Sequence, residues 1–216
     1  MRKTRRRART DRDTPWNPAE RRLLARLRSP EAIQAFLDGI PYNDEKTCRS
    51  PRRVMRDKKA HCFEGALFAA AALAQIGHPP VLLDLGAVRD DDHVLAIFRQ
   101  KGAYGALGKS NFTGLRYRAP VYRSLRELAM SYFDDYFNTL GERTLRSYSR
   151  RFRLTERVHS GWRTAEEDLD DIGDRLTAQR HFPLLAPGAA RTLARVDPRL
   201  LESGLLGANA KGLYRP

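Results

Sequence analysis

HCFEGALFAAAALAQI, residues 61–76, is the most strongly patterned stretch of the sequence. It is rich in alanine and leucine, which favour helix, and it is apolar on nearly every side apart from Glu64 and Gln75. A helix that is apolar all round belongs in a protein core. The stretch therefore predicts a central buried helix, which the glycine at position 77 and the prolines after His78 bring to an end.

Short apolar runs after this helix predict strands. Val81–Leu85 and Val94–Phe98 read as buried strands, and Lys101-Gly102 supplies a turn after which Ala103–Leu107 returns as a hairpin partner. A hairpin makes the sheet antiparallel at this point. The centre of the chain is therefore expected to be an α+β domain in which the buried helix packs on an antiparallel sheet.

Other helices are expected on both sides of this centre. Ala19–Arg28 has helical spacing of its leucines, and Ser29-Pro30-Glu31 is a helix-start signal for an amphipathic helix that ends at Gly39. Ser124–Asn138 reads as a further helix. From Thr155 the pattern loosens into short apolar pieces punctuated by prolines, which predicts a helical or irregular C-terminal extension.

The positive charge of the chain is concentrated near its start. The formal net charge is +14, and the first 28 residues carry eleven Arg or Lys against three acidic residues. We expect residues 1–18 to be a basic, disordered arm that is simply solvated. The alternative is that the arm makes loose contact with nucleic acid or another polyanion. Residues 19–154 are then the core domain and residues 155–216 the extension. The acidic cluster over residues 166–174 is expected to be a solvated helix face or a partner of the arm, because its spacing fits no metal-binding loop.

The compartment is expected to be cytoplasmic. No stretch approaches the roughly 18 to 20 apolar residues that span a membrane, and Met1 is followed by arginines without an apolar signal core. The two cysteines, Cys48 and Cys62, are too few for a disulfide framework, and a reducing compartment leaves them as thiols. A single cysteine with a functional role is therefore a possibility that this pair of thiols leaves open.

Cys62 has the position that a nucleophilic cysteine needs. In the first turn of a helix, unpaired N–H groups and the positive end of the helix dipole favour a thiolate, and the same N–H groups can bind an oxyanion. A base must come from elsewhere in the fold. His93 begins an apolar strand directly after the charged loop Arg89–Asp92, so it is expected to be rigid and to reach Cys62.

These residues resemble the core of the transglutaminase-like superfamily. The resemblance is carried by Arg53-Val54-Met55, His61–Ala66, Gly77 and Asp92-His93-Val94, and it covers roughly residues 29–138. It implies a papain-like α+β core in which Cys62 opens the central helix and His93 begins the next strand but one. It further implies acyl transfer or hydrolysis at an amide bond of a protein, peptide or other substrate, without a cofactor.

In that family a third residue, usually Asp, follows the histidine, but no Asp stands at that spacing after His93. If the hairpin turn has two residues, Gln100 pairs with Ala103, and counting outward places Ser110 opposite His93. A one-residue bulge shifts the facing residue to Asn111, whose amide oxygen is the better acceptor for an imidazole N–H. We therefore expect Asn111 to orient His93, with Ser110 as the alternative, unless the pair is merely a polar turn. Asp92 and Asp84 are weaker candidates.

Less specific interpretations remain for the same residues. The alternative interpretation of Cys62 is a small core residue, and that of His61 beside it is a structural or capping residue. A zinc site is not expected, because adjacent residues such as His61 and Cys62 seldom both reach one ion. A non-catalytic binding module of the same fold, using its basic arm, is the alternative function. Cys48 and His93 are also residue types that bind zinc. His78 is expected to lie in a turn, and His159 and His181 are expected to lie outside the core.

Overall fold

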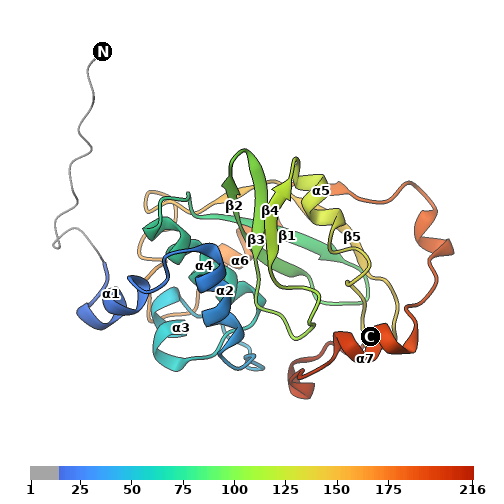
Figure 1. Cartoon of the computed structure of the whole chain (residues 1–216), viewed down its shortest axis with the longest axis horizontal. Helices are drawn as coiled ribbons and strands as arrows, with labels where there is room; N and C mark the ends of the chain where they lie inside the picture. The colour runs from blue at the N-terminus through green and yellow to red at the C-terminus, as the bar shows by residue number, and fades with distance from the viewer. Residues whose placement is uncertain (1–14) are drawn as a thin grey trace, which may run out of the picture.

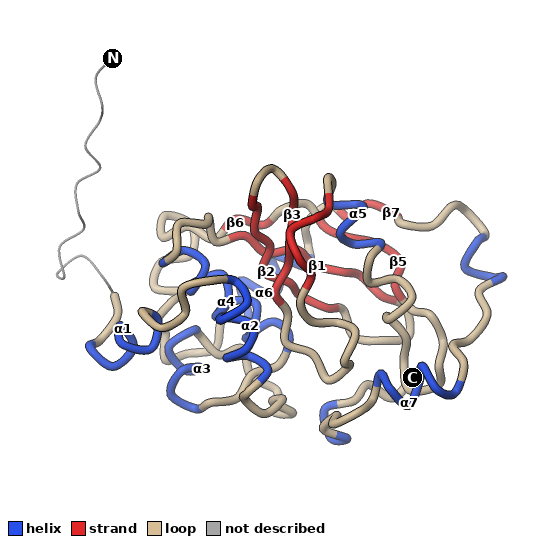
Figure 2. The backbone as a smooth tube through the Cα atoms, viewed as in Figure 1, coloured by secondary structure: helices blue, strands red, loops and turns tan. Residues whose placement is uncertain are grey.

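The computed structural model describes residues 15–216, and residues 1–14 of the expected basic arm lie outside the described residues. Seven strands form one open antiparallel sheet in the order β4-β3-β2-β1-β5-β7, and β6 also pairs with β1 (Figure 2). The strands are β1 (Val81–Ala87), β2 (His93–Gln100), β3 (Ala103–Leu107), β4 (Arg118–Tyr122), β5 (Leu145–Ser149), β6 (Phe152–Arg153) and β7 (His181–Pro183).

Helices cover both faces of this sheet. The four N-terminal helices gather on one side of it, whereas α5 lies on the other side with the C-terminal segment (Figure 1). Two hydrophobic clusters lie on the two faces of the sheet, and residues along β2 alternate between them. Val94 and Ala96 belong to the cluster with the N-terminal helices, and Leu95 and Ile97 belong to the cluster with α5. The helices are α1 (Pro18–Leu24), α2 (Pro30–Asp38), α3 (Pro51–Asp57), α4 (Cys62–Gln75), α5 (Leu125–Met130), α6 (Asp170–Thr177) and α7 (Pro198–Gly204), with 3-10 turns at Ala189–Thr192 and Ala210–Gly212.

The central helix is the buried one that the sequence predicts. All its residues from Phe63 to Leu73 are buried, and it packs on the face of β2 and against α2 and α3. His61 precedes it with an extended backbone (φ −92°, ψ −172°), which makes His61 the N-cap and Cys62 the first helical residue. The predicted α+β class is therefore confirmed as a mixed fold of helices and an antiparallel sheet.

The predicted hairpin register is also confirmed within the sheet. Gln100 faces Ala103, and the pairing continues without a shift to Ala96 opposite Leu107. The ladder ends there, because the chain leaves the sheet at Gly108. Residues 110 and 111 are therefore not strand partners of His93.

Two expected boundaries differ from the structure. Residues 15–18 do not belong to the basic arm, because Trp16 is buried in the core and Asn17 caps α1. The helix expected over 124–138 ends at Met130, since the next residues form tighter turns in which Tyr132 and Phe133 each bond three residues back.

The C-terminal region contributes residues to the hydrophobic clusters on both faces of the sheet. Trp162 and Ile172 belong to the hydrophobic cluster around α4, Leu184 belongs to the cluster on the other face, and β7 extends the sheet beside β5. Among residues 15–216, no helix combines the length and apolar character needed to cross a membrane.

Candidate active site

Cys62 and His93 meet at one end of the sheet's strands, where the start of α4 lies beside the start of β2. The Cys62 sulfur lies 3.8 Å from the carbonyl oxygen of Asp92, and the side chains of His61 and His93 both hydrogen-bond to that sulfur. All four residues line a pocket of about 410 Å³. The nucleophile and base expected from the sequence are therefore neighbours.

A backbone carbonyl fixes the ring of His93. The Nε2 atom lies 2.7 Å from the carbonyl oxygen of Leu115, and a carbonyl can only accept, so Nε2 carries a proton. The nitrogen left to face the Cys62 sulfur is Nδ1. The ring is 4% exposed and packs edge-on against Tyr136, with centroids 6.4 Å apart. This imidazole has one tautomer and one orientation.

The loop before His93 is tied to the segment after α5. Tyr136 donates its hydroxyl to the Asp91 carbonyl at 2.7 Å, and Asn138 donates to the Arg89 carbonyl at 3.1 Å. Thr144 donates to the Asp90 carboxylate at 2.7 Å. These bonds come from residues more than 40 positions away in sequence, which is why sequence spacing alone did not reveal them.

The loop that carries the Leu115 carbonyl is anchored to α2 and α4. Gln34 exchanges two hydrogen bonds with the backbone of Gly108, at 2.9 and 3.2 Å. Lys109 buries its ammonium group against the Leu37 and Ile40 carbonyls at the end of α2, and burial lowers its pKa to about 8. Gly65 makes this crossing possible, because a Cβ at that position would lie 2.5 Å from the Lys109 Cβ.

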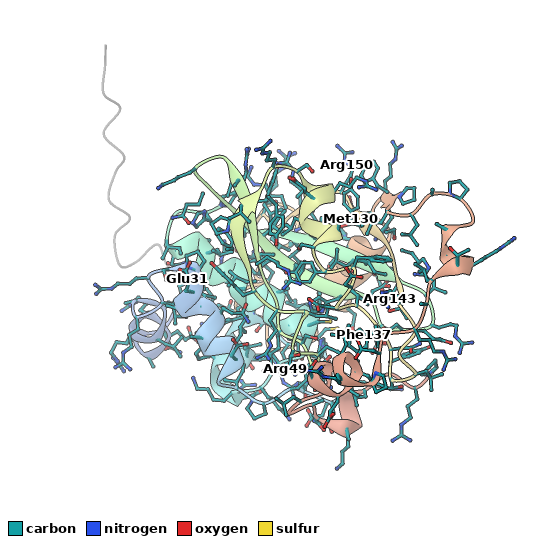
Figure 3. The ribbon with its side chains drawn as sticks, turned by 45° about the vertical axis from the view of Figure 1, so that its right-hand side comes forward. Glu31, Arg49, Met130, Phe137, Arg143 and Arg150 are labelled. Carbon is teal, nitrogen blue, oxygen red and sulfur yellow. The ribbon has the colours of Figure 1, made fainter. Side chains whose placement is uncertain are left out.

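The start of α4 is organised by a fully buried carboxylate, that of Glu64. It accepts hydrogen bonds from the His61 N–H at 3.0 Å, the Thr47 hydroxyl at 2.8 Å and the Asn43 amide at 3.1 Å. Arg49, labelled in Figure 3, adds its backbone N–H at 3.0 Å and its guanidinium at 3.2 Å. Glu64 thus holds the loop over residues 43–49 against the residues around Cys62.

The two thiols of the chain lie in opposite electrostatic surroundings. Burial alone would raise the pKa of Cys62, but hydrogen bonds and positive charge from His61 and His93 lower the pKa to about 6. Burial raises the pKa of Cys48 to about 12, and a hydrogen bond to Asp170 and the charge of that carboxylate add to the effect. Cys62 is therefore mostly thiolate at neutral pH and Cys48 is a thiol.

A tyrosine that the sequence analysis did not select lies beside the nucleophile. The Tyr42 hydroxyl accepts a hydrogen bond from the Cys62 backbone N–H, and its side chain lines the same pocket. Burial, followed by the charges of Cys62, Asp91 and Glu64, raises the pKa of Tyr42 well above its ordinary value. The phenol therefore keeps its proton and can donate it in a hydrogen bond.

Asn111 does not orient His93, contrary to the expectation from register. Its amide oxygen accepts from the Asn209 N–H at 2.8 Å, and its amide nitrogen donates to the Asn209 and Gly212 carbonyls at 3.1 and 2.9 Å. Ser110 accepts from the Phe112 N–H at 3.0 Å. Both residues line the pocket, and Asn111 fixes the C-terminal segment, whose Lys211–Tyr214 stretch forms another part of the wall.

The weaker candidates for the third position also bond elsewhere. The Asp92 carboxylate accepts from the Ala87 N–H at 2.7 Å, and the buried Asp84 carboxylate lies 3.1 Å from Nε2 of His181. Burial, with the charge of Asp92 added, raises the pKa of Asp84 to about 6. His159 is not outside the core, as it is 6% exposed and packs against Phe152.

No group of three or more His, Cys, Asp or Glu side chains within residues 15–216 is arranged to hold a metal ion. No model of a known protein family matches the sequence, and the search of curated proteins also found no match.

Proposed function

We propose that this protein is a transglutaminase-like cysteine enzyme with a papain-like core, and that it hydrolyses or transfers the acyl group of an amide bond through Cys62 and His93. The observation that carries the proposal is the placement of the Cys62 sulfur at a helix start, hydrogen-bonded to an oriented histidine and facing a pocket of about 410 Å³. A cysteine helix packed on an antiparallel sheet supports the papain-like core.

Acylation begins with the thiolate. In the resting site the Cys62 proton is held on Nδ1 of His93; the thiolate sulfur attacks the carbonyl carbon, so that a C–S bond forms and the carbonyl π electrons move to oxygen. When the tetrahedral intermediate collapses, the C–N bond breaks and the leaving amine takes the proton from His93. Water or a second amine, deprotonated by His93, then attacks the thioester and releases the Cys62 thiolate.

The oxyanion forms beside the first turn of α4. The Cys62 N–H lies at that helix start, and the Tyr42 hydroxyl already bonded to it has a proton to donate. Donors fixed before the reaction stabilise developing charge without reorganisation. Tyr42→Phe is therefore expected to slow acylation by on the order of 100-fold, whereas alkylation of Cys62 by iodoacetamide, which forms no oxyanion, keeps its rate.

The direct test is acylation of the full chain by a small activated ester, p-nitrophenyl acetate, with a set of fluorogenic peptide amides to follow. Mass spectrometry should find the acetyl group on Cys62, and His93→Asn should lower the acylation rate by about 100-fold or more. Cys62→Ser should abolish it with a nearly unchanged melting temperature, because the replacement of sulfur by oxygen leaves little cavity.

An unmodified Cys62 in the wild-type chain under these conditions would contradict the enzyme proposal. It would favour the binding module, for which salt-dependent binding of a polyanion by the full chain is the measurement.

A further inference from the structure

His61 stands immediately before Cys62, and its ring is held in one position. Its Nε2 atom lies 2.6 Å from the Thr47 carbonyl oxygen and 3.6 Å from Oε1 of Glu64, and 19% of the side chain is exposed. Because the carbonyl only accepts, Nε2 carries a proton. The nitrogen left for the Cys62 sulfur, to which the His61 side chain hydrogen-bonds, is Nδ1.

Thr47 and Glu64 hold the His61 ring in this position. The Glu64 carboxylate bonds to the His61 N–H and also to the Thr47 hydroxyl, so that one buried group fixes both the helix start and the carbonyl that orients the ring. Cys62 therefore lies between two imidazoles, His61 and His93, each with Nε2 bound by a backbone carbonyl.

The surroundings of the two rings differ in charge. His61 faces the Glu64 carboxylate, whose Oε1 atom also pairs with the Arg49 guanidinium, the charge of Asp91 on the β1–β2 loop, and the Cys62 sulfur. His93 faces the same sulfur and the charge of Asp90, and it packs against the ring of Tyr136 and the Leu115 carbonyl. Burial opposes a charge on His61, yet the hydrogen bond and charge of Cys62, followed by the charge of Glu64, raise the pKa of His61 to about 9.

We propose that His61 is a second functional imidazole, which stays protonated beside Cys62 and helps to hold the sulfur as a thiolate, while His93 carries the reacting proton to the leaving amine and recovers it from the acceptor. The His61 proton comes from solvent and is not consumed, so each turnover moves only the proton held on His93, which passes to the leaving amine and is recovered from the acceptor. The role of His93 rests on the proposed function, but the effect of His61 on the thiolate does not.

The test follows alkylation of Cys62 in the full chain by iodoacetamide as a function of pH, with mass spectrometry of the Cys62 peptide, and needs no substrate. His61→Asn removes the ionisable ring and keeps a good N-cap residue. The alkylation rate at pH 6.5 is expected to fall about tenfold or more, with an unchanged rate at pH 10, so that the midpoint moves up by at least one unit. His61→Lys, which restores a cation, should recover much of the loss.

His78→Asn, at the far end of α4, is the matched control and should label as the wild type does. An unchanged midpoint in a stably folded His61→Asn chain would overturn the proposal, because His61 would then be only a cap. Equal loss in His61→Lys would overturn the role of the charge.

A measurement on the wild-type chain covers the case in which these variants fail to fold. Nitrogen NMR of the histidine rings should find His61 doubly protonated at pH 7, and a neutral His61 ring would overturn the proposal. Failure of the proposed function would look different, since Cys62 would keep its low alkylation midpoint while no acyl group formed on it.

Discussion

The Nε2 atom of His93 and the carbonyl oxygen of Leu115 lie 2.7 Å apart, so a backbone group orients the imidazole. An uncharged acceptor fixes the ring without favouring its protonated form as a carboxylate would. Substitution of a side chain at position 115 leaves this acceptor in place. The bond can instead be disturbed by moving the loop over residues 108–116.

Gly108→Ala should disturb that bond directly. A Cβ at position 108 would lie 2.9 Å from Cδ2 of Leu95, 3.0 Å from Nε2 of His93 and 3.1 Å from the Leu115 oxygen, so it would crowd both bonded atoms. We expect Cys62 acylation by p-nitrophenyl acetate to fall at least tenfold, because a displaced imidazole no longer faces the sulfur. Gly173→Ala in α6 is the control, since its Cβ would meet its nearest neighbour at 3.8 Å. Equal rates in both variants would show that the orientation of His93 does not matter.

Cys62 should react with iodoacetamide far faster than Cys48. With a pKa of about 6, Cys62 is mostly thiolate at pH 7, whereas Cys48, with a pKa of about 12, stays protonated. The Cys62 rate should lose about half of its plateau value near pH 6, as the thiolate takes up a proton. Peptide mass spectrometry after timed alkylation measures both sites. Equal labelling of the two cysteines in the folded chain would contradict the nucleophile assignment.

Asn111→Ala should loosen the C-terminal segment and leave the thiolate unchanged. The substitution removes three hydrogen bonds to residues 209 and 212, and unpaired buried backbone groups cost about 1–3 kcal/mol. Hydrogen exchange should quicken over residues 209–214, while the alkylation midpoint of Cys62 stays near pH 6. Ser110→Ala, which loses one hydrogen bond within its own turn, is the control. A shifted Cys62 midpoint in Asn111→Ala would restore Asn111 as a part of the catalytic group.

Asp84→Asn should stabilise the protein at neutral pH. Burial raises the pKa of Asp84 from the ordinary 3.8 to about 6, so the folded chain holds this proton more tightly than the unfolded chain does. Ionisation of Asp84 therefore costs stability as pH rises from about 4 to 6, by about 3 kcal/mol at most. Urea unfolding should give the variant an advantage at pH 7.5 that disappears near pH 4. A less stable variant at pH 7.5 would mean that the ionised pair with His181 is favourable.

The parts of the fold that follow local patterns were predictable from the sequence. The residues over 61–76 form a buried helix because no polar stripe runs along them, and the two-residue turn at Lys101-Gly102 sets the register up to Leu107. The extrapolation to Asn111 failed because the chain leaves the sheet at Gly108, where Gln34 binds it from α2.

The candidate site was predictable only where residue type carries the chemistry. Cys62 and His93 stand at the starts of a helix and a strand, and each has a side chain that can move a proton. The acceptor for His93 is a carbonyl oxygen that every residue possesses, so its position depends on the path of a loop. Tyr42 directly precedes the loop over residues 43–49, and the Thr47 carbonyl of that loop holds the His61 ring. The shape of the loop depends on the buried Glu64.

The C-terminal segment that Asn111 holds has a practical consequence for work on this protein. Because Tyr214 lines the pocket, residues fused after Pro216 would begin two positions beyond the pocket wall. An affinity tag or reporter at that end would change the measured rates without any change at Cys62. Labels for binding or activity assays therefore belong ahead of residue 15, where the described chain begins on the far side of the molecule from α7 (Figure 1).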